Sequence, residues 1–367
     1  MVAALGEGRR IVVKLGSALL VDLDGDVRRE WLTTLIADIA ARRRAGDEII
    51  VVSSGAIALG ARRLGLPHGG RDSLDDAQAA AAAGQIILSG LFSELLSAEG
   101  LVAAQMLVTL SDLADRRRYL NASATLGRLL TLGVVPVLNE NDSTATEEIR
   151  FGDNDRLAAR VGQAASADLV VLLSNVKGLF DRDPAEADAK LIAEVGPDEP
   201  LTATLGPSSG MGSGGMAAKV EAGRIAAGSG IALAIADGRD ANPLAAYLKG
   251  GLGTLFAPAV APSARKSWLL GHLDLRGTLI VDEGAASALS TGASLLAAGV
   301  TSVEGEFERG DAVGVAGPDG ALLARGLVAY DAADLRRIAG LRRDAQAVQL
   351  GYAPRAAVVH RNDMGFL

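Results

Sequence analysis

The sequence has no cysteine, only three histidines, and aromatic residues at just 3% of its 367 positions. Without cysteine, the chain has no disulfides, no thiolate metal sites and no cysteine nucleophile. His68, His272 and His360 lie outside the segments that are rich in acidic and small polar residues. No Ser-His-Asp set is therefore indicated, and we expect structural roles for the three histidines. Because aromatic residues are scarce, the core must be aliphatic.

No stretch reaches the roughly 18 uninterrupted apolar residues of a membrane span. The Ala-rich residues 77–91 are interrupted by Gly84, Gln85 and Ser89 and predict a buried helix. Residues 1–10 lack the apolar centre of a signal peptide, so we expect a cytoplasmic protein. The formal net charge of −8 gives no general attraction to nucleic acid or anionic membranes. A function that handles anions must therefore concentrate a few cations locally.

The length favours two domains, because one compact core seldom holds so many residues. In the first part, continuous apolar runs alternate with helical patterns. This predicts an α/β domain with a mainly parallel sheet sandwiched by helices. Strands are expected at residues 11–15, 49–53, 101–107, 134–138, 169–173 and 231–235. Helices are expected at residues 30–44, 76–96, 111–130, 156–165 and 216–227.

The sequence pattern changes after residue 275, where short apolar segments are separated by turn signals such as Pro318-Asp319-Gly320. This pattern predicts a small β-rich domain of barrel or sandwich type. Its segments are expected at residues 278–281, 294–296, 300–303, 312–315 and 322–328, with a helix at 285–288. We expect a catalytic domain over residues 1–262, a linker over 263–275, the β-rich domain over 276–355 and a tail over 356–367.

Residues 139–155 are the most unusual stretch, with six carboxylates and three carboxamides. They directly follow a predicted buried strand, and ligands bind at the carboxyl ends of strands in open α/β sheets. Asp142, Asp153 and Asp155 could bind Mg²⁺ indirectly, position lysines or recognise an amino group. Asn154 and its neighbouring carboxamides can bond both amine and carboxylate groups. A site is therefore predicted here, with an acidic solvated loop as the alternative.

Three glycine-containing turns provide places for an anion. Lys14 stands at the end of the first strand, before Gly16, and Ser54-Gly55 follows the second strand in the same way. Residues 206–215 form a Gly/Ser loop that leads into a predicted helix carrying Lys219, and helix N-termini favour anions. The loop lacks the Gly-Lys-Ser/Thr ending of a P-loop. Two lysines, three such turns and a cluster of acids together predict phosphoryl transfer.

Five motifs in order resemble those of the bacterial glutamate 5-kinase family. They are Lys14-Leu15-Gly16-Ser17, Ser53-Ser54-Gly55-Ala56, Asn139-Glu140-Asn141-Asp142, Gly152-Asp153-Asn154-Asp155 and Gly214-Gly215-Met216-x-x-Lys219. The similarity continues to Val359-His360-Arg361-Asn362-Asp363 near the end of the chain. The resemblance implies the amino acid kinase fold with a C-terminal PUA domain. It also implies phosphorylation of the γ-carboxylate of L-glutamate by ATP with Mg²⁺, the first step of proline biosynthesis.

The resemblance also implies roles for individual residues. Lys14 and Lys219 would neutralise the transferred phosphoryl group, and Asp155 would orient them. Ser54, Asp142 and Asn154 would hold glutamate, while backbone N–H groups of Gly16 and Gly55 would line the phosphate path. The nucleotide would contact Lys14, Ser174, Asn175, Ser213, Gly214, Gly215, Met216, Ala217, Ala218 and Lys219. The family commonly has Asp where this chain has Asn175, which keeps an acceptor oxygen but loses a charge.

As partners, the resemblance implies proline as an inhibitor, a homo-oligomer (dimer or tetramer) and functional coupling to glutamate-5-semialdehyde dehydrogenase. An RNA-binding protein is the rival hypothesis, because PUA-like domains occur in RNA-modifying enzymes. Residues 276–352 contain seven arginines, no lysine and ten carboxylates, a net charge of −3. This balance disfavours RNA, whose binding depends on phosphate neutralisation. A catalytically inactive paralogue is disfavoured because both lysines and Asp155 are present.

Overall fold

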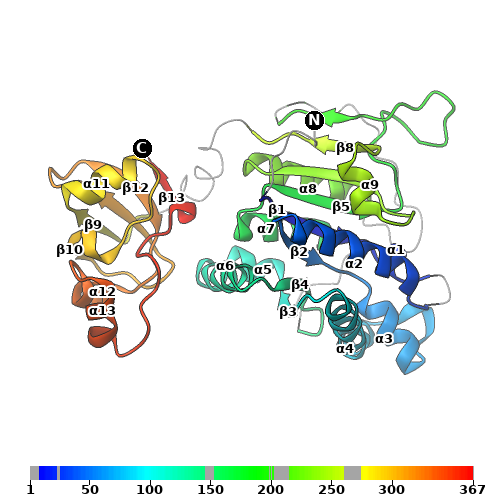
Figure 1. Ribbon diagram of the computed structural model, residues 1–367, viewed down its shortest axis with the longest axis horizontal. Helices are drawn as coiled ribbons and strands as arrows, with labels where there is room; N and C mark the ends of the chain where they lie inside the picture. The colour runs from blue at the N-terminus through cyan, green and yellow to red at the C-terminus, as the bar shows by residue number, and fades with distance from the viewer. Residues whose placement is uncertain are drawn as a thin grey trace. The chain divides into compact units, whose positions relative to one another are not determined.

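The computed structural model describes residues 8–22, 25–144, 153–197, 199, 201, 215–259 and 274–366. The chain divides into two compact units, Met1–Ala114 with Ala122–Ala259 and Asp115–Asn121 with Val260–Leu367. Each unit contains its own sheet (Figure 1).

The first sheet has eight strands in the order β3-β4-β2-β1-β5-β7-β8-β6. They are β1 (Arg10–Leu15), β2 (Glu48–Val52), β3 (Ala103–Val108), β4 (Val135–Glu140), β5 (Leu169–Ser174), β6 (Glu194–Val195), β7 (Ala232–Asp237) and β8 (Gly253–Phe256). Among these strands, β7 and β8 form the one antiparallel pair. The mainly parallel sheet predicted from the continuous apolar runs is therefore confirmed.

Helices cover both faces of this sheet (Figure 1). The helices in this part of the chain are α1 (Ser17–Leu20), α2 (Arg29–Arg44), α3 (Ala56–Leu64), η2 (Pro67–Gly69), α4 (Leu74–Ala98), α5 (Leu110–Ala114), α6 (Arg116–Thr131), α7 (Asp153–Ala165), α8 (Met216–Gly228) and α9 (Pro243–Leu248). Alternate strand residues pack with α2, α4 and α9 into one aliphatic core. On the other side, α7 contacts β1, β4 and β5, and α8 contacts β7.

The helix expected over residues 111–130 is two helices, α5 and α6. The side chain of Asp115 accepts the backbone N–H of Arg118, as an N-cap residue does, and so begins α6. Thr109 and Asp112 cap α5 reciprocally, each side chain accepting the backbone N–H of the other residue. The apolar periodicity continues through the break, which is why it predicted one helix.

The second unit has a five-stranded sheet in the order β10-β9-β11-β12-β13. Its elements are β9 (Gly277–Val281), α11 (Glu283–Ser290), η3 (Ala297–Gly299), β10 (Val300–Gly305), β11 (Ala312–Ala316), β12 (Leu322–Leu327), α12 (Ala332–Ile338), α13 (Arg343–Leu350), η4 (Arg361–Asp363) and β13 (Met364–Phe366). The expected strand-rich domain is confirmed. Residues 364–366, expected in a tail, pair with β12, and Leu295 makes only an isolated bridge to Val359 among the described residues.

Helix α4 is long and apolar enough, by composition, to span a membrane. In the structure, Leu88, Phe92 and Leu96 of this helix are buried in the core against the sheet. Its backbone also touches α3 directly, since a Cβ on Gly84 would lie 1.8 Å from the carbonyl oxygen of Ala56. The predicted buried helix is therefore present, and two glycines, Gly60 and Gly84, set how closely it approaches α3.

Replacing Gly84 with Ala should lower the free energy of unfolding by about 3 kcal/mol, because α3 and α4 must move apart to admit the methyl group. Gly90 provides a matched control on the same helix, since a Cβ there would meet nothing within 4 Å. Gly90→Ala should stabilise the protein by about 0.5–1 kcal/mol through helix propensity. Urea denaturation measures both variants, and equal effects would contradict the close packing.

Candidate active site

Two lysines and one aspartate form a buried cluster at the centre of the first sheet. The Nζ of Lys14 lies 2.5 Å from Oδ1 of Asp155, and the Nζ of Lys219 donates to Oδ2 over 2.8 Å. Asp155 is fully buried, and the lysines are 6% and 5% exposed. The one carboxylate thus fixes both ammonium groups.

Three separate elements bring these residues together. Lys14 belongs to β1, which pairs with β2 and β5 in the middle of the sheet. Asp155 lies in the first turn of α7 and Lys219 in the first turn of α8. The two helices contact each other, and α7 also contacts β1. The cluster is therefore fixed by the packing of two helix N-termini over the central strand.

Burial and charge act against each other in this cluster. Burial lowers the pKa of Lys14 below its ordinary value, Asp155 acts to raise it, and Lys219 lowers it further. Burial alone would raise the pKa of Asp155, but the two ammonium groups outweigh burial and hold that pKa below its ordinary value. Counted by formal charge, two lysines and one aspartate give the cluster one excess positive charge, which suits an anion.

A chain of amide hydrogen bonds fixes Asn154 beside the cluster. Its Nδ2 donates to Oγ of Ser54 over 3.0 Å and to Oδ1 of Asn139 over 3.3 Å. The Nδ2 of Asn139 in turn donates to Oε1 of Gln85 over 2.8 Å. These bonds leave Oδ1 of Asn154 buried without a partner among the described residues. The arrangement presents an acceptor to an incoming donor such as an ammonium group.

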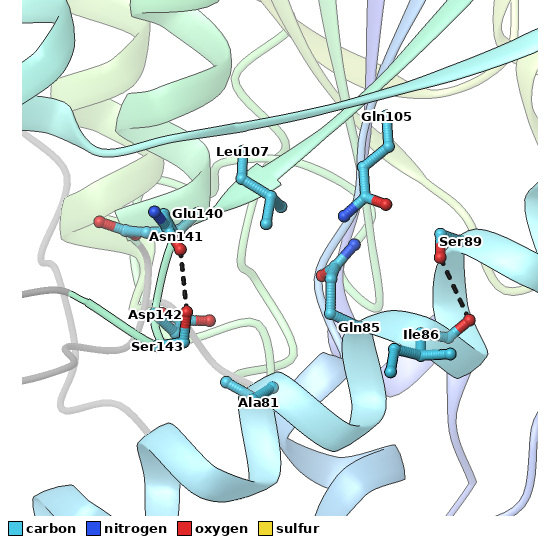
Figure 2. Close-up of a pocket in the computed structure, with 11 residues that line it drawn as sticks. Ala81, Gln85, Ile86, Ser89, Gln105, Leu107, Glu140, Asn141, Asp142 and Ser143 are labelled. Carbon is cyan, nitrogen blue, oxygen red and sulfur yellow. Dashed lines mark hydrogen bonds between the residues drawn. The ribbon is translucent and has the colours of Figure 1, made fainter.

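A cavity of about 290 Å³ lies next to these hydrogen-bonded amides, between α4, β3 and the segment that follows β4 (Figure 2). Gln85 and Asp142 both line it. Asp142 is 8% exposed. Asp142 also interacts electrostatically with Arg71: burial lowers the pKa of that arginine, and Asp142 acts to raise it. The structure therefore places Asp142 on the same side of the site as the Asn139–Gln85 hydrogen bond.

The residues expected at the nucleotide lie on β5 and α8. Ser174 is buried at the end of β5, and its Oγ lies 3.4 Å from Oδ1 of the exposed Asn175. Gly215 is the N-cap of α8, and Met216, Ala217 and Ala218 form its first turn with Lys219. Ser213 and Gly214 lie outside the described residues, as do Glu147 and Glu148.

Gly55 and Gly16, the glycines expected beside the phosphate groups, differ in backbone conformation and hydrogen bonding. Gly55 has φ +104° and begins α3, a backbone conformation that favours glycine. Gly16 donates its N–H to the carbonyl of Leu173 over 3.2 Å, so a phosphate there would share that donor. Their contact with phosphate stays a prediction.

Sequence reasoning gave no role to Gln85 or Arg71. Gln85 interrupts the Ala-rich helix as a polar residue, and that interruption is the signal that could have identified it. Arg71 follows a Gly-Gly pair in a loop, and nothing in the local pattern connects it to Asp142, which lies far along the chain.

Comparisons with known proteins agree with this architecture. The model of the amino acid kinase family matches residues 9–237, and that of the PUA domain matches residues 277–348. The glutamate 5-kinase of Novosphingobium aromaticivorans is 59% identical over 361 residues, which cover 98% of this chain and 96% of the relative. That of Sphingopyxis alaskensis is 60% identical, with 98% and 97% covered. That of Rhizobium etli is 51% identical, with 98% and 93% covered.

The fold, the buried Lys-Asp-Lys cluster and the family match define a kinase of the amino acid kinase family. Within it, the chain belongs to the glutamate 5-kinase family, as the identities over nearly full lengths show. The resemblance stated from the five motifs is thereby confirmed, together with the C-terminal PUA domain.

Replacing Asp155 with Asn should lower the free energy of unfolding at pH 7 by about 3–5 kcal/mol, because two buried ammonium groups lose their counter-charge. The folded-state pKa of Asp155 is depressed. The advantage of the wild type should therefore be present above the unfolded pKa of about 3.9 and be lost as the pH falls through the lower folded-state value. Urea denaturation between pH 7 and pH 2 measures this difference.

The exposed Asp183 is the matched control for this prediction. Asp183→Asn should leave the free energy of unfolding within about 0.5 kcal/mol of the wild type. A difference between wild type and Asp155→Asn that stays constant down to pH 2 would contradict the ionised, bridging role of Asp155.

Proposed function

We propose that this protein transfers the γ-phosphoryl group of ATP to the γ-carboxylate of L-glutamate, forming L-glutamyl 5-phosphate for proline biosynthesis. The observation that carries the proposal is the buried pair of lysines held by Asp155, with one excess positive charge. The names of relatives that match 51–60% of positions over nearly the whole chain support glutamate as the acceptor.

The reaction needs charge neutralisation more than acid–base chemistry. A carboxylate oxygen of glutamate attacks the γ-phosphorus, a new P–O bond forms, and the bond to the bridging oxygen breaks and releases ADP. The attacking group is already ionised at neutral pH, so no residue has to remove a proton from it. Lys14 and Lys219 approach Asp155 from different elements, and we assign them to the negative charge that spreads over the moving phosphoryl group.

The amide chain supplies the recognition of glutamate in this proposal. Asn154 Oδ1 is buried and unpaired, and its Nδ2 is held by Ser54 and Asn139. We assign this oxygen, with the carboxylate of Asp142, to the α-ammonium group of the substrate. Gln85 accepts a hydrogen bond from Asn139, and we assign it to positioning that side chain.

The nucleotide is assigned to Ser174, Asn175 and the N-terminal turn of α8, where backbone N–H groups and the helix dipole favour phosphates. Mg²⁺ would enter with ATP and neutralise its phosphates. Each carboxylate oxygen of Asp155 faces an ammonium group, so this residue fits the role of positioning the lysines better than that of a metal ligand.

The remaining expectations stay proposals; the first three rest on the family resemblance, the location on the missing signal-peptide pattern and the RNA expectation on the charge of residues 276–352. They are inhibition by proline, a dimer or tetramer, coupling to glutamate-5-semialdehyde dehydrogenase, a cytoplasmic location and no role for RNA. We also propose the domain limits given above, with β13 included in the second domain because it pairs with β12.

An assay of ADP release with glutamate, aspartate and N-acetylglutamate tests the acceptor. Glutamate should be phosphorylated at the highest kcat/KM. N-acetylglutamate lacks the ammonium group that Asn154 and Asp142 would bind, and aspartate is one methylene too short to reach the phosphoryl group. Turnover with either of these and none with glutamate would overturn the proposal.

Lys219→Ala should lower kcat by at least about 100-fold, because its charge acts mainly on the transition state. The KM for glutamate should change by less than about threefold. Lys249 is a control because it is exposed at the end of α9. Lys249→Ala should keep wild-type kinetics. Unchanged turnover in Lys219→Ala would remove this lysine from the mechanism.

A further inference from the structure

The second unit contains a cavity of about 260 Å³ that the kinase reaction does not use. Its polar lining consists of three arginines, Arg342, Arg343 and Arg355, with the hydroxyl of Tyr330 and the amide of Gln346. Among the described residues, no carboxylate lines it. This contrasts with the net charge of −3 over residues 276–352.

Hydrogen bonds hold two of the polar side chains that line the cavity. The hydroxyl oxygen of Tyr330 accepts the backbone N–H of Arg355 over 2.6 Å, which leaves the phenol proton available to donate. The amide nitrogen of Gln346 donates to the carbonyl of Leu341 over 2.7 Å, which fixes that side chain. Within the described part of the chain, none of the three lining arginines forms an ion pair with a carboxylate.

Two of the three arginines lie at the start of α13, where positive charge is unfavourable and Asp344 is the acidic residue of the first turn. Arg342 is the N-cap of α13 and Arg343 its first residue, so both charges stand at the positive end of the helix dipole, and no side chain caps that end. Arg309, which interacts electrostatically with Arg355, is partly buried, and its Nε has no hydrogen-bond partner among the described residues. Burial lowers the pKa of Arg309, and the neighbouring charge of Arg355 lowers it further.

We propose that this cavity is a binding site for a small dianion that carries phosphate or carboxylate groups. Guanidinium groups bind such oxyanions with paired hydrogen bonds, and the N-terminus of α13 adds a favourable dipole. A volume of about 260 Å³ suits a small molecule. The negative charge of the surrounding domain would repel a long polyanion, which favours a small ligand over a nucleic acid.

Isothermal titration calorimetry on the full chain at low salt tests the site, with inorganic phosphate, pyrophosphate and succinate as probes. Phosphates and carboxylates are thereby distinguished. The variants are Arg342→Gln with Arg343→Gln, and separately Arg355→Gln. Arg336→Gln is the control, because Arg336 pairs with Glu306 and does not line the cavity. Because the kinase site is the same in every variant, heat from anions bound there cancels in the comparison.

At least one probe should bind the wild type and Arg336→Gln equally, and the double variant about 100-fold more weakly, near tenfold for each lost guanidinium. Arg355→Gln should weaken binding about tenfold, which keeps the test valid if the double variant folds poorly. Equal affinity of all variants for every probe, or no binding by the wild type, would overturn the proposal. Binding of a single-stranded RNA, lost in the double variant, with none of the small anions bound would overturn it in favour of a nucleic-acid site.

Discussion

The bridge from Asp155 to Lys14 and Lys219 is the interaction on which the rest of the catalytic unit depends. Burying a lone carboxylate or a lone ammonium group costs free energy, because the charge loses its hydration. Here the carboxylate of Asp155 pairs with the ammonium groups of Lys14 and Lys219, and a single formal positive charge remains. We propose that this remaining charge acts on the phosphoryl group during its transfer. Removing the carboxylate alone would leave two buried ammonium groups without a counter-charge, which is why the cluster depends on Asp155.

The sheet makes this bridge possible because its parallel strands end at one edge. Lys14, Asn139 and Ser174 all lie near the carboxyl ends of β1, β4 and β5. The aliphatic core fixes these ends, since alternate residues of the strands pack against α2, α4 and α9 while α7 and α8 cover the other face. The close contact of α3 with α4 holds Gln85 where it reaches Asn139. Packing far from the chemistry therefore orients the amide of Asn154.

Much of this was predictable from the sequence where the signal is local. The runs at residues 11–15 and 169–173 are continuous and apolar, and they form β1 and β5. The two-residue strand β6 and the four-residue strand β8 carry too little pattern to be recognised. The capping role of Asp115, which divides α5 from α6, depends on one hydrogen bond that periodicity does not reveal.

The same distinction, between local sequence signals and contacts that only the fold reveals, holds for the candidate site. Lys14, Asp155 and Lys219 were identified from motifs, yet only the fold shows that one carboxylate holds both ammonium groups. Gln85 and Asn139 are 54 positions apart, and their hydrogen bond exists because α4 crosses beside the end of β4. An amide can present either its oxygen or its nitrogen to a ligand, so the identity of Asn154 alone does not decide what it recognises. Because Ser54 and Asn139 occupy its nitrogen, the oxygen is the atom left for a further contact, and the recognition of a donor that we propose depends on the fold.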